Sequence, residues 1–410
     1  MLFKYEVKKI LWKKGARAAL AVLALWMIGS LFFVVHSSSW VQEDGTELHG
    51  LQAVRRIREA KTQWNGTLTE ERIAEVIRAN RQIHDDYPDS EKDINESQTV
   101  YSKIQPFQDI RDIINSSFAR FKDYDYYRAD HLAESDASLF YLNRSQGIEE
   151  WLNEEIKMRP ISDKAKAFYM DSARTLETPL EYKYMDGWNT ALNYSSMVLF
   201  VNLIVICILL APVFGIEYQT GADAVFLSSR YGRSKGIRAK LAGAFTVATA
   251  VYWISMLFFI GVIFIIYGTS GGMCPIQANE YCWKSFYHLT NVQALGIILG
   301  LGYLGCLVMS SITLFISARM KSAFAAIILA FVVLIVPQMM DVTSIPMLQK
   351  IFNLMPHQSI ASYMLIRSYD VFQIGNRMIT PPAMIAIIYL PVSLLILPFT
   401  YRSFKYHQVN

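Results

Sequence analysis

Six long apolar segments dominate the pattern of hydrophobic and polar positions along this chain of 410 residues. None of them contains Asp, Glu, Lys, Arg or His, and each has 18 residues or more. At 1.5 Å per residue the shortest helix would reach about 27 Å, close to the roughly 30 Å hydrocarbon thickness of a bilayer. Because a backbone in lipid must satisfy its own hydrogen bonds, each segment is predicted to be a membrane-spanning helix. The segments are 18–35, 197–214, 241–266, 295–316, 323–340 and 384–401.

A long polar region, residues 37–195, separates the first two apolar segments. Its hydrophobic residues recur at spacings of three and four, which is typical of amphipathic helices. Thr69 followed by two glutamates predicts a helix start, and Ser162 predicts another. The region is therefore predicted to be mostly helical. The apolar stripes are expected at Ile73, Val76, Ile77 and Ile83, and at Ile110, Ile113, Ile114, Phe118 and Phe121.

The distribution of charge predicts the orientation in the membrane. Residues 1–17 carry six Lys or Arg and one acid, Glu6, and the segments after the second, fourth and sixth spans are also basic. Positive charge favours the cytosolic side. The chain is thus predicted to be an all-α polytopic membrane protein with six transmembrane helices, cytosolic N- and C-termini and an extracellular helical domain between helices 1 and 2. Residues 37–195 hold 20 Lys or Arg against 29 Asp or Glu.

Three regions follow from this topology. Residues 1–36 form the cytosolic N-terminus and the first span, residues 37–195 the extracellular domain, and residues 196–410 the other five spans. The last region includes a cytosolic loop, 215–240, and an outer segment, 341–380. A cleaved signal peptide over residues 1–36 is the alternative for the N-terminus, although a convincing A-x-A cleavage site is missing.

The predicted spans lack ionisable groups, which bears on the energy source. Pumps driven by ion gradients usually keep carboxylates or histidines at membrane depth. The work of this protein is therefore expected to be powered from outside the bilayer. The basic residues flank the spans, where anionic lipid accounts for most of them, and no nucleic-acid motif is present.

The cytosolic loop is the most informative polar stretch. It has an acidic residue, Glu217, a break at Gly221, a short semi-apolar helix expected over 222–229, and a basic run that leads into the third span. Such a helix can place its apolar face in a groove of a partner while Arg230 and Arg233 meet carboxylates at the rim. The alternative is a basic loop that only fixes the topology.

The order Glu-Tyr-Gln-Thr-Gly at 217–221, followed by the short helix and the basic run, resembles the loop between the second and third spans in permease subunits of bacterial type-2 ABC exporters. In that family this helix is the coupling helix, which inserts into an ATP-hydrolysing subunit. The resemblance implies that the chain is the permease of an ATP-binding-cassette transporter, an exporter, in the bacterial plasma membrane. The ATPase-coupling residues expected on this basis are Glu217, Tyr218, Thr220, Gly221, Phe226, Ser228, Ser229, Arg230 and Arg233.

The motor is expected on a separate polypeptide. No G-x-x-x-x-G-K-[ST] phosphate loop occurs in the chain. ATP and Mg²⁺ would then be bound by the partner ATPase, and this chain would bind no cofactor and no metal directly. A second permease chain, identical or homologous, is expected to complete the pore.

The outer segment is too apolar for a solvated loop. Pro337 and Gln338 near the end of the fifth span, with Pro356 beyond, interrupt regular helix. Short helices tucked into the outer interface, or a re-entrant element, are predicted as a possible outer gate. Lipid-facing interfacial helices with no gating role are the alternative.

Cys274 and Cys282 lie eight residues apart in the loop between the third and fourth spans. On an oxidising exterior they can form a disulfide or remain free thiols, and the sequence leaves both states open.

Two other function classes are alternatives to a transporter. A receptor or sensor would bind a ligand in the extracellular domain, but its inside segments are short for a signalling domain. An intramembrane enzyme is disfavoured because no H-E-x-x-H occurs and the seven histidines are scattered. The chain is therefore not expected to be an enzyme.

Overall fold

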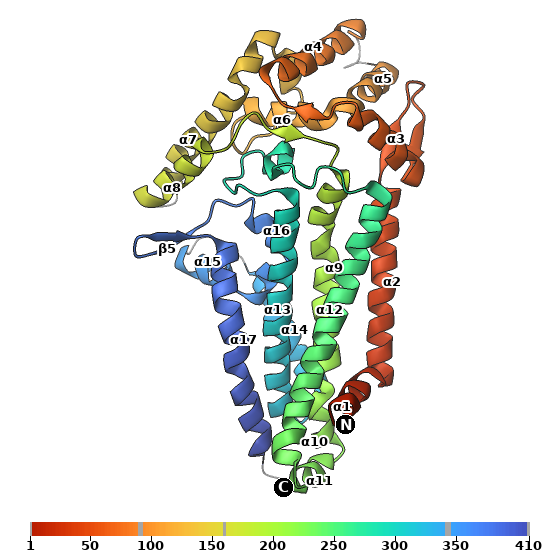
Figure 1. The fold of residues 1–410 in the computed structure, drawn as a ribbon, viewed down its shortest axis with the longest axis vertical. Coiled ribbons are helices and arrows are strands. Elements are labelled where there is room, and N and C mark those ends of the chain that lie inside the picture. The colour runs from red at the N-terminus through yellow and green to blue at the C-terminus, as the bar shows by residue number, and fades with distance from the viewer. Residues whose placement is uncertain (1, 89–92, 159–160, 341–345, 408–410) are drawn as a thin grey trace.

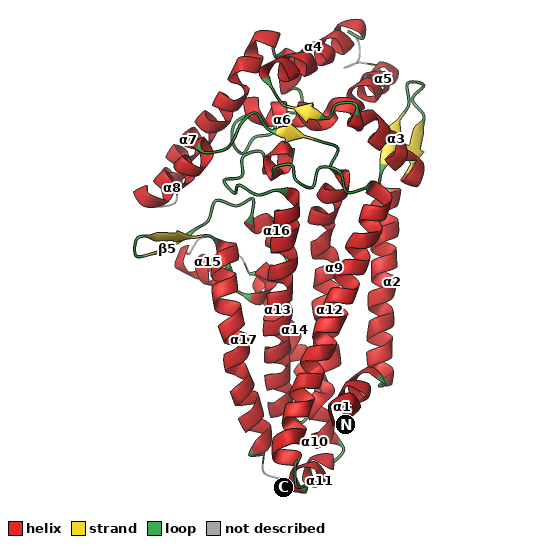
Figure 2. Cartoon of the chain, viewed as in Figure 1, coloured by secondary structure: helices red, strands yellow, loops and turns green. Residues whose placement is uncertain are grey.

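The computed structural model describes residues 2–88, 93–158, 161–340 and 346–407. A bundle of long helices carries a second, smaller assembly of helices at one end (Figure 1). Both chain termini lie at the opposite end of the bundle, which we call the base. The smaller assembly, residues 37–185, is called the head. Helices account for most of the described chain (Figure 2).

Five helices in the described residues are long and apolar enough to cross a membrane. They indicate a multi-pass membrane protein of the all-α class. The bundle helices are α2 (Lys14–His36), α9 (Asp186–Leu210), α10 (Pro212–Gln219), α12 (Ile237–Tyr267), α13 (Asn291–Arg319), α14 (Ala323–Met339) and α17 (Pro381–Lys405). Helix α13 lies at the centre of the bundle and contacts α9, α12, α14 and α17.

The sequence predicted six spans, and the fifth, predicted over 323–340, is a helix one residue shorter in the structure. Helix α14 is apolar but has 17 residues and includes Pro337. It ends at Met339 and is followed by Met340 in an extended conformation. Residues 341–345 of the outer segment lie outside the described residues. The second span also differs, because Pro212, which has no backbone N–H, begins a separate helix, α10.

The head is mostly helical, as the sequence predicted. Thr69 Oγ1 accepts from the N–H of Arg72 at 3.3 Å, and Ser162 Oγ accepts from the N–H of Ala165 at 3.2 Å, so both predicted helix starts are confirmed. The head helices are α3 (Gly50–Thr62), α4 (Glu70–Asp86), α5 (Ile94–Ile104), α6 (Gln108–Phe118), α7 (Phe140–Met158) and α8 (Asp163–Arg174), with 3-10 turns η1 (Gln105–Phe107), η2 (Arg128–His131) and η3 (Glu134–Leu139). Ile73, Val76, Ile77, Ile110, Ile113 and Ile114 form its buried core.

Three short antiparallel strand pairs were not predicted. β1 (Ser39–Val41) pairs with β2 (Glu47–His49), β3 (Gly66–Thr67) with β4 (Glu181–Tyr182), and β5 (Phe372–Ile374) with β6 (Arg377–Ile379). Gly66 pairs with Tyr182, which brings the segment after α3 next to the C-terminal end of the head. Helix α9 then begins at Asp186, so the end expected at residue 195 lies inside a helix.

The loop between α12 and α13 packs beneath the head. It contains two 3-10 turns, η5 (Ile276–Ala278) and η6 (Glu280–Cys282). Arg144 of α7 is 2% exposed and donates to the carbonyl oxygens of Trp283 at 2.7 Å and Ser285 at 2.8 Å. A third bond runs to the carbonyl of Ala173 at 3.2 Å. The guanidinium therefore fastens the loop to the head through backbone oxygens.

Cys274 and Cys282 in this loop are free and buried. Both pack in the main hydrophobic core, and Cys282 Sγ lies 3.5 Å from the hydroxyl of Tyr363. Burial raises the pKa of each thiol to about 11. Of the two alternatives that the sequence left open, the structure has free thiols and no disulfide between them.

Candidate functional site

The predicted coupling loop folds at the base as a short helix between two turns. Helix α10 ends at Gln219, and Gly221 then adopts a φ of 65°, in the left-handed region that favours glycine. This turn reverses the chain into α11 (Ala222–Ser228). A π-helical turn, η4 (Gly232–Gly236), leads from α11 into α12. The predicted short helix over 222–229 is thus confirmed, and Figure 1 places it at the tip of the base.

Glu6, Lys9, Glu217 and Lys240 form a compact set of charges behind α11, which we call the basal ion cluster. Lys240 is fully buried, and its Nζ lies 2.6 Å from Glu217 Oε1 and 3.2 Å from Glu6 Oε2. Lys9 Nζ donates to the same Glu217 oxygen. Two acids and two bases therefore neutralise one another, with Glu6, Glu217 and Lys240 buried and Lys9 partly exposed. Each charge needs this arrangement, because an unpaired buried charge is expensive.

The cluster joins three separate parts of the chain. Glu6 and Lys9 belong to α1 (Leu2–Leu11), Glu217 to α10 and Lys240 to the start of α12. Lys13, which follows α1, lies close by. Burial and the positive charges of Lys9 and Lys240 lower the pKa of Lys13 to about 8. The two carboxylates, Glu6 and Glu217, are thus already neutralised by Lys9 and Lys240, and a charge on Lys13 would be in excess.

One face of α11 is fixed to this framework. The ring of Phe226 lies 5.0 Å from Lys240 Nζ and 5.8 Å from the ring of Phe404 in α17. Leu227 is buried, and Asp223 is 3.5 Å from His407 Nε2. No space separates α11 from η4, because a Cβ on Gly232 would lie 1.7 Å from the carbonyl oxygen of Phe226.

Arg233, predicted to reach a partner, bonds within the chain. Its Nε donates to the carbonyl of Leu227 at 3.1 Å and its Nη1 to that of Lys405 at 2.8 Å. The hydroxyl of Tyr401 donates to the Arg233 carbonyl at 2.9 Å. Arg233 therefore ties α11 to the end of α17.

The opposite face of α11 is open. Val225 is 74% exposed, and Ser228, Ser229 and Arg230 are exposed beside it. Both serine hydroxyls donate to carbonyls of their own helix, at 3.1 Å and 2.7 Å. Thr220 and Gly221 extend this surface. We call these residues, Thr220, Gly221, Val225, Ser228, Ser229 and Arg230, the basal face.

The predicted coupling residues thus divide into two groups. Thr220, Gly221, Ser228, Ser229 and Arg230 lie on the basal face. The other four, Glu217, Tyr218, Phe226 and Arg233, contact the rest of the chain. The hydroxyl of Tyr218 donates to the Ala318 carbonyl at 2.8 Å, and its ring lies tilted against the His407 ring, with 4.4 Å between centroids.

Sequence reasoning missed the partners of Glu217. Two signals pointed to them: Glu6 is the one acid in a basic N-terminal segment, and Lys240 directly precedes an apolar run. Both were assigned to topology alone.

The residues Gly232-Arg-Ser-Lys-Gly236 match a G-x-S-x-G nucleophile motif, so the expectation that the chain has no such motif is wrong. That motif needs a sharp turn from a strand into a helix. Here it forms a π-helical turn, and the Ser234 hydroxyl donates to the Tyr231 carbonyl at 3.4 Å. The geometry of a hydrolase nucleophile is not present at Ser234.

The residues of the proposed outer gate lie on neighbouring elements. Pro337 and Gln338 end α14, and Gln338 Nε2 donates to the Leu334 carbonyl at 3.1 Å. Pro356 starts η7 (Pro356–Ser359), which contacts both α14 and α13. The segment also holds two further short helices, α15 (Pro346–Phe352) and α16 (Ser362–Leu365), and the strands β5 and β6. Short helices are therefore present, while their place in the outer interface and a gating role stay predictions.

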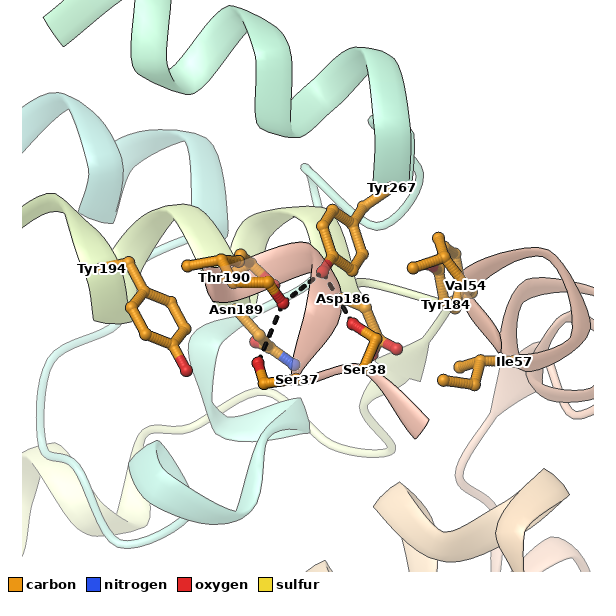
Figure 3. Close-up of a pocket in the computed structure, with 11 residues that line it drawn as sticks. Ser37, Ser38, Val54, Ile57, Tyr184, Asp186, Asn189, Thr190, Tyr194 and Tyr267 are labelled. Carbon is orange, nitrogen blue, oxygen red and sulfur yellow. Dashed lines mark hydrogen bonds between the residues drawn. The ribbon is translucent and has the colours of Figure 1, made fainter. Parts of the chain in front are cut away.

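Between the head and the bundle lies a small cavity of about 160 Å³ (Figure 3). Tyr267 of α12 turns its hydroxyl toward Ser38, 2.8 Å away, at the end of α2. Asp186 at the start of α9 lines the same cavity. It pairs with Lys61 of α3 at 3.1 Å, and Lys61 also lies 2.7 Å from Asp109 of α6. These ion pairs connect the head to α9.

Comparison of the chain with protein-family models, with curated proteins and with solved structures finds no match. The arguments for a function therefore come from the residues and their arrangement.

Proposed function

We propose that the chain is the membrane-spanning permease subunit of a bacterial ATP-binding-cassette transporter, working as an exporter in the plasma membrane. A separate ATPase subunit, which carries ATP and Mg²⁺, would dock on the basal face. The observation that carries the proposal is the division of α11 into a fixed face and an open one. Phe226 and Leu227 hold the helix to the bundle, while Val225 and Arg230 remain available to a partner.

The surroundings of α11 suit a mechanical role. Removing one member of a buried ion pair typically costs about 3–5 kcal/mol. Glu217 and Lys240 are both nearly inaccessible to water, so the base resists separation of α10 from α12. A partner that displaced α11 would therefore move α1, α12 and the end of α17 with it. This is the rigid-body element that a coupled conformational change requires.

As such a permease, the chain would have six spans, with α14 as the fifth, and both termini in the cytosol. The proposal also includes a second permease chain, identical or homologous. The head would then lie outside the cell.

The interior of the bundle contains polar side chains. Asn202 of α9 and Ser255 of α12 are both buried and are hydrogen-bonded to each other.

Site-specific photo-crosslinking tests the docking surface. A photo-reactive amino acid at Val225 is expected to capture a polypeptide that contains a phosphate loop for ATP, identified by mass spectrometry. Ile265 is the matched control, since it is 82% exposed but lies near the head end of α12. Capture of the ATPase at both positions, or at neither in cells that express its gene, contradicts the docking assignment.

A receptor is the second candidate, and the Lys61 bridge favours it. A ligand that shifted α3 or α6 would pull on Asp186 and hence on α9. The crosslinking experiment at the base distinguishes the two candidate functions. The receptor account expects the Val225 crosslink to a signalling protein without a nucleotide-binding fold.

A further inference from the structure

A second feature of the base is a basic groove beside α11, with a volume of about 610 Å³. Its walls are the end of α13, the connection from α13 to α14, and the end of α17 with the two residues that follow it. Three cations line it: Arg319, Lys321 and Arg402. We call it the basal groove.

These three cations lack counter-charges within the described part of the chain. Arg319, Lys321 and Arg402 are exposed, and no carboxylate among the described residues pairs with them. The arrangement contrasts with the basal ion cluster, where each cation meets a glutamate. His407 also lines the groove, and its Nε2 lies 3.5 Å from the carboxylate of Asp223. Charge balance at the basal groove must therefore come from outside these residues.

The geometry of Arg319 suits an anion. A guanidinium has five N–H donors in a planar fork. Its Nε donates to Ser403 Oγ at 2.9 Å, which fixes the plane of the group. The terminal nitrogens remain available, and paired donors of this kind match the oxygens of a phosphate.

Exposed apolar side chains continue from the groove along α17, toward the middle of that helix. Phe399 is 59% exposed and lines the groove one turn before Arg402. Leu395, 63% exposed, lies one turn earlier. Residues three and four apart lie on the same helix face, so these two side chains and Arg402 form one stripe. The stripe is charged at the base and apolar above it, which fits a ligand with an anionic head and a hydrocarbon tail.

We propose that the basal groove binds one anionic phospholipid. Its phosphate contacts Arg319, Lys321 and Arg402, and an acyl chain lies along Phe399 and Leu395. Basic pockets between transmembrane helices at the membrane surface recognise headgroups in this way. The site does not depend on the proposed function, because it holds for any protein that places α17 across a bilayer.

Competition between lipids tests the site on the full chain. The protein is incubated with phosphatidylcholine vesicles that contain phosphatidylglycerol, extracted gently, and the retained lipids are counted by native mass spectrometry. Wild-type protein is expected to retain phosphatidylglycerol in preference to phosphatidylcholine. Arg319→Gln with Lys321→Gln and Arg402→Gln should reduce this preference by about fivefold for each charge removed.

The matched control removes three exposed cations outside the groove: Lys14→Gln, Lys235→Gln and Arg238→Gln. It carries the same change of net charge and should keep the preference within about twofold, because no shaped site is lost. Equal losses in both triple variants would mean diffuse surface attraction and overturn the proposal. Arg319→Lys with Arg402→Lys checks folding, since it retains the charges and should keep most of the preference.

Two further outcomes identify the occupant. Leu395→Ala with Phe399→Ala should weaken retention of phosphatidylglycerol, because the acyl chain loses its contact surface. An acidic protein surface is the rival occupant. If the Gln triple variant keeps its lipid preference but loses a co-purifying protein partner, the lipid site is refuted.

Discussion

Lys240 and Glu217 face each other across 2.6 Å with 0% and 5% of their side chains exposed, although they belong to different helices that sequence patterns treat as separate spans. The pair fixes where the loop between them can lie. Residues 218–239 start and finish at this ion pair. The pair therefore closes a loop that holds α11 at the base.

Glu217→Gln is expected to destabilise the protein by about 3–5 kcal/mol, because it leaves Lys240 buried with weaker compensation. Thermal unfolding in detergent, followed by circular dichroism, measures the change. The double variant Glu217→Gln with Lys240→Met should recover much of the loss, since it removes both charges. Glu59→Gln is the control: Glu59 and Arg56 are 66% and 60% exposed, and such pairs contribute little. A Glu217 variant as stable as the control would contradict a structural role for the cluster.

Lys61→Met is expected to loosen the head from the bundle. The change leaves Asp109 and Asp186 without their cation, because their oxygens lie 2.7 Å and 3.1 Å from Lys61 Nζ. Hydrogen exchange should increase in α3 and in the first turns of α9, with no change in α11. The control is Lys103→Met, because Lys103 is 33% exposed and lies 3.9 Å from an exposed Glu43 carboxylate. Uniform exchange through the whole chain would indicate global unfolding and not release of the head.

The free energy of unfolding is expected to depend on pH through the carboxyl group of Glu280. Burial, together with the nearby Asp112, raises the pKa of its carboxyl from 4.5 to about 7. Between these values the folded protein binds the proton more tightly than the unfolded chain, so this group's contribution to stability falls as pH rises from 4.5 to 7. Glu280→Gln removes the penalty and should stabilise the protein at pH 8 by about 1–2 kcal/mol.

The Glu280→Gln gain should shrink at pH 5, where the wild-type carboxyl is already protonated. Apparent melting temperatures at the two pH values measure it. Glu43→Gln, at a 78% exposed side chain, should show no such difference. A gain for Glu280→Gln that is equal at pH 5 and pH 8 would exclude titration of this carboxyl as the cause.

Cys274 and Cys282 should remain unreactive in the native protein, because both thiols are buried and burial raises the pKa of each to about 11. The measurement is maleimide labelling of a Cys207→Ala, Cys306→Ala variant, made without reductant. Two labels are expected in denaturant and none before it. Labelling in denaturant only after reduction would show a disulfide instead.

Long apolar segments and helix starts were the features that sequence could predict. Uninterrupted apolar runs leave few alternatives to helix, and Thr69 and Ser162 satisfy free N–H groups locally. The length of α14 was predicted to within one residue, because the helix, like the apolar run 323–340, continues through Pro337 and ends at Met339. Strand pairs such as Gly66 with Tyr182 join residues that no local pattern relates.

The sequence predicted where the candidate site lies in the chain, but not the buried ion pairs that hold it. The glycine break and the short helix are local, so Gly221 and α11 were found from sequence. The partner of Glu217 is 23 residues away at Lys240, and the second base, Lys9, is 208 residues away. A rule that assigns basic residues near spans to topology cannot separate Lys240, which is buried, from Arg238, which is exposed.

Arg144 implies an order in the biosynthesis of the protein. Two of its acceptors, on Trp283 and Ser285, follow it by 139 and 141 residues. A ribosome therefore finishes α7, α8, α9 and α12 before this guanidinium can find those oxygens. Until then the guanidinium cannot make these bonds, and the head can reach its final form only after the loop that follows α12 has been synthesised.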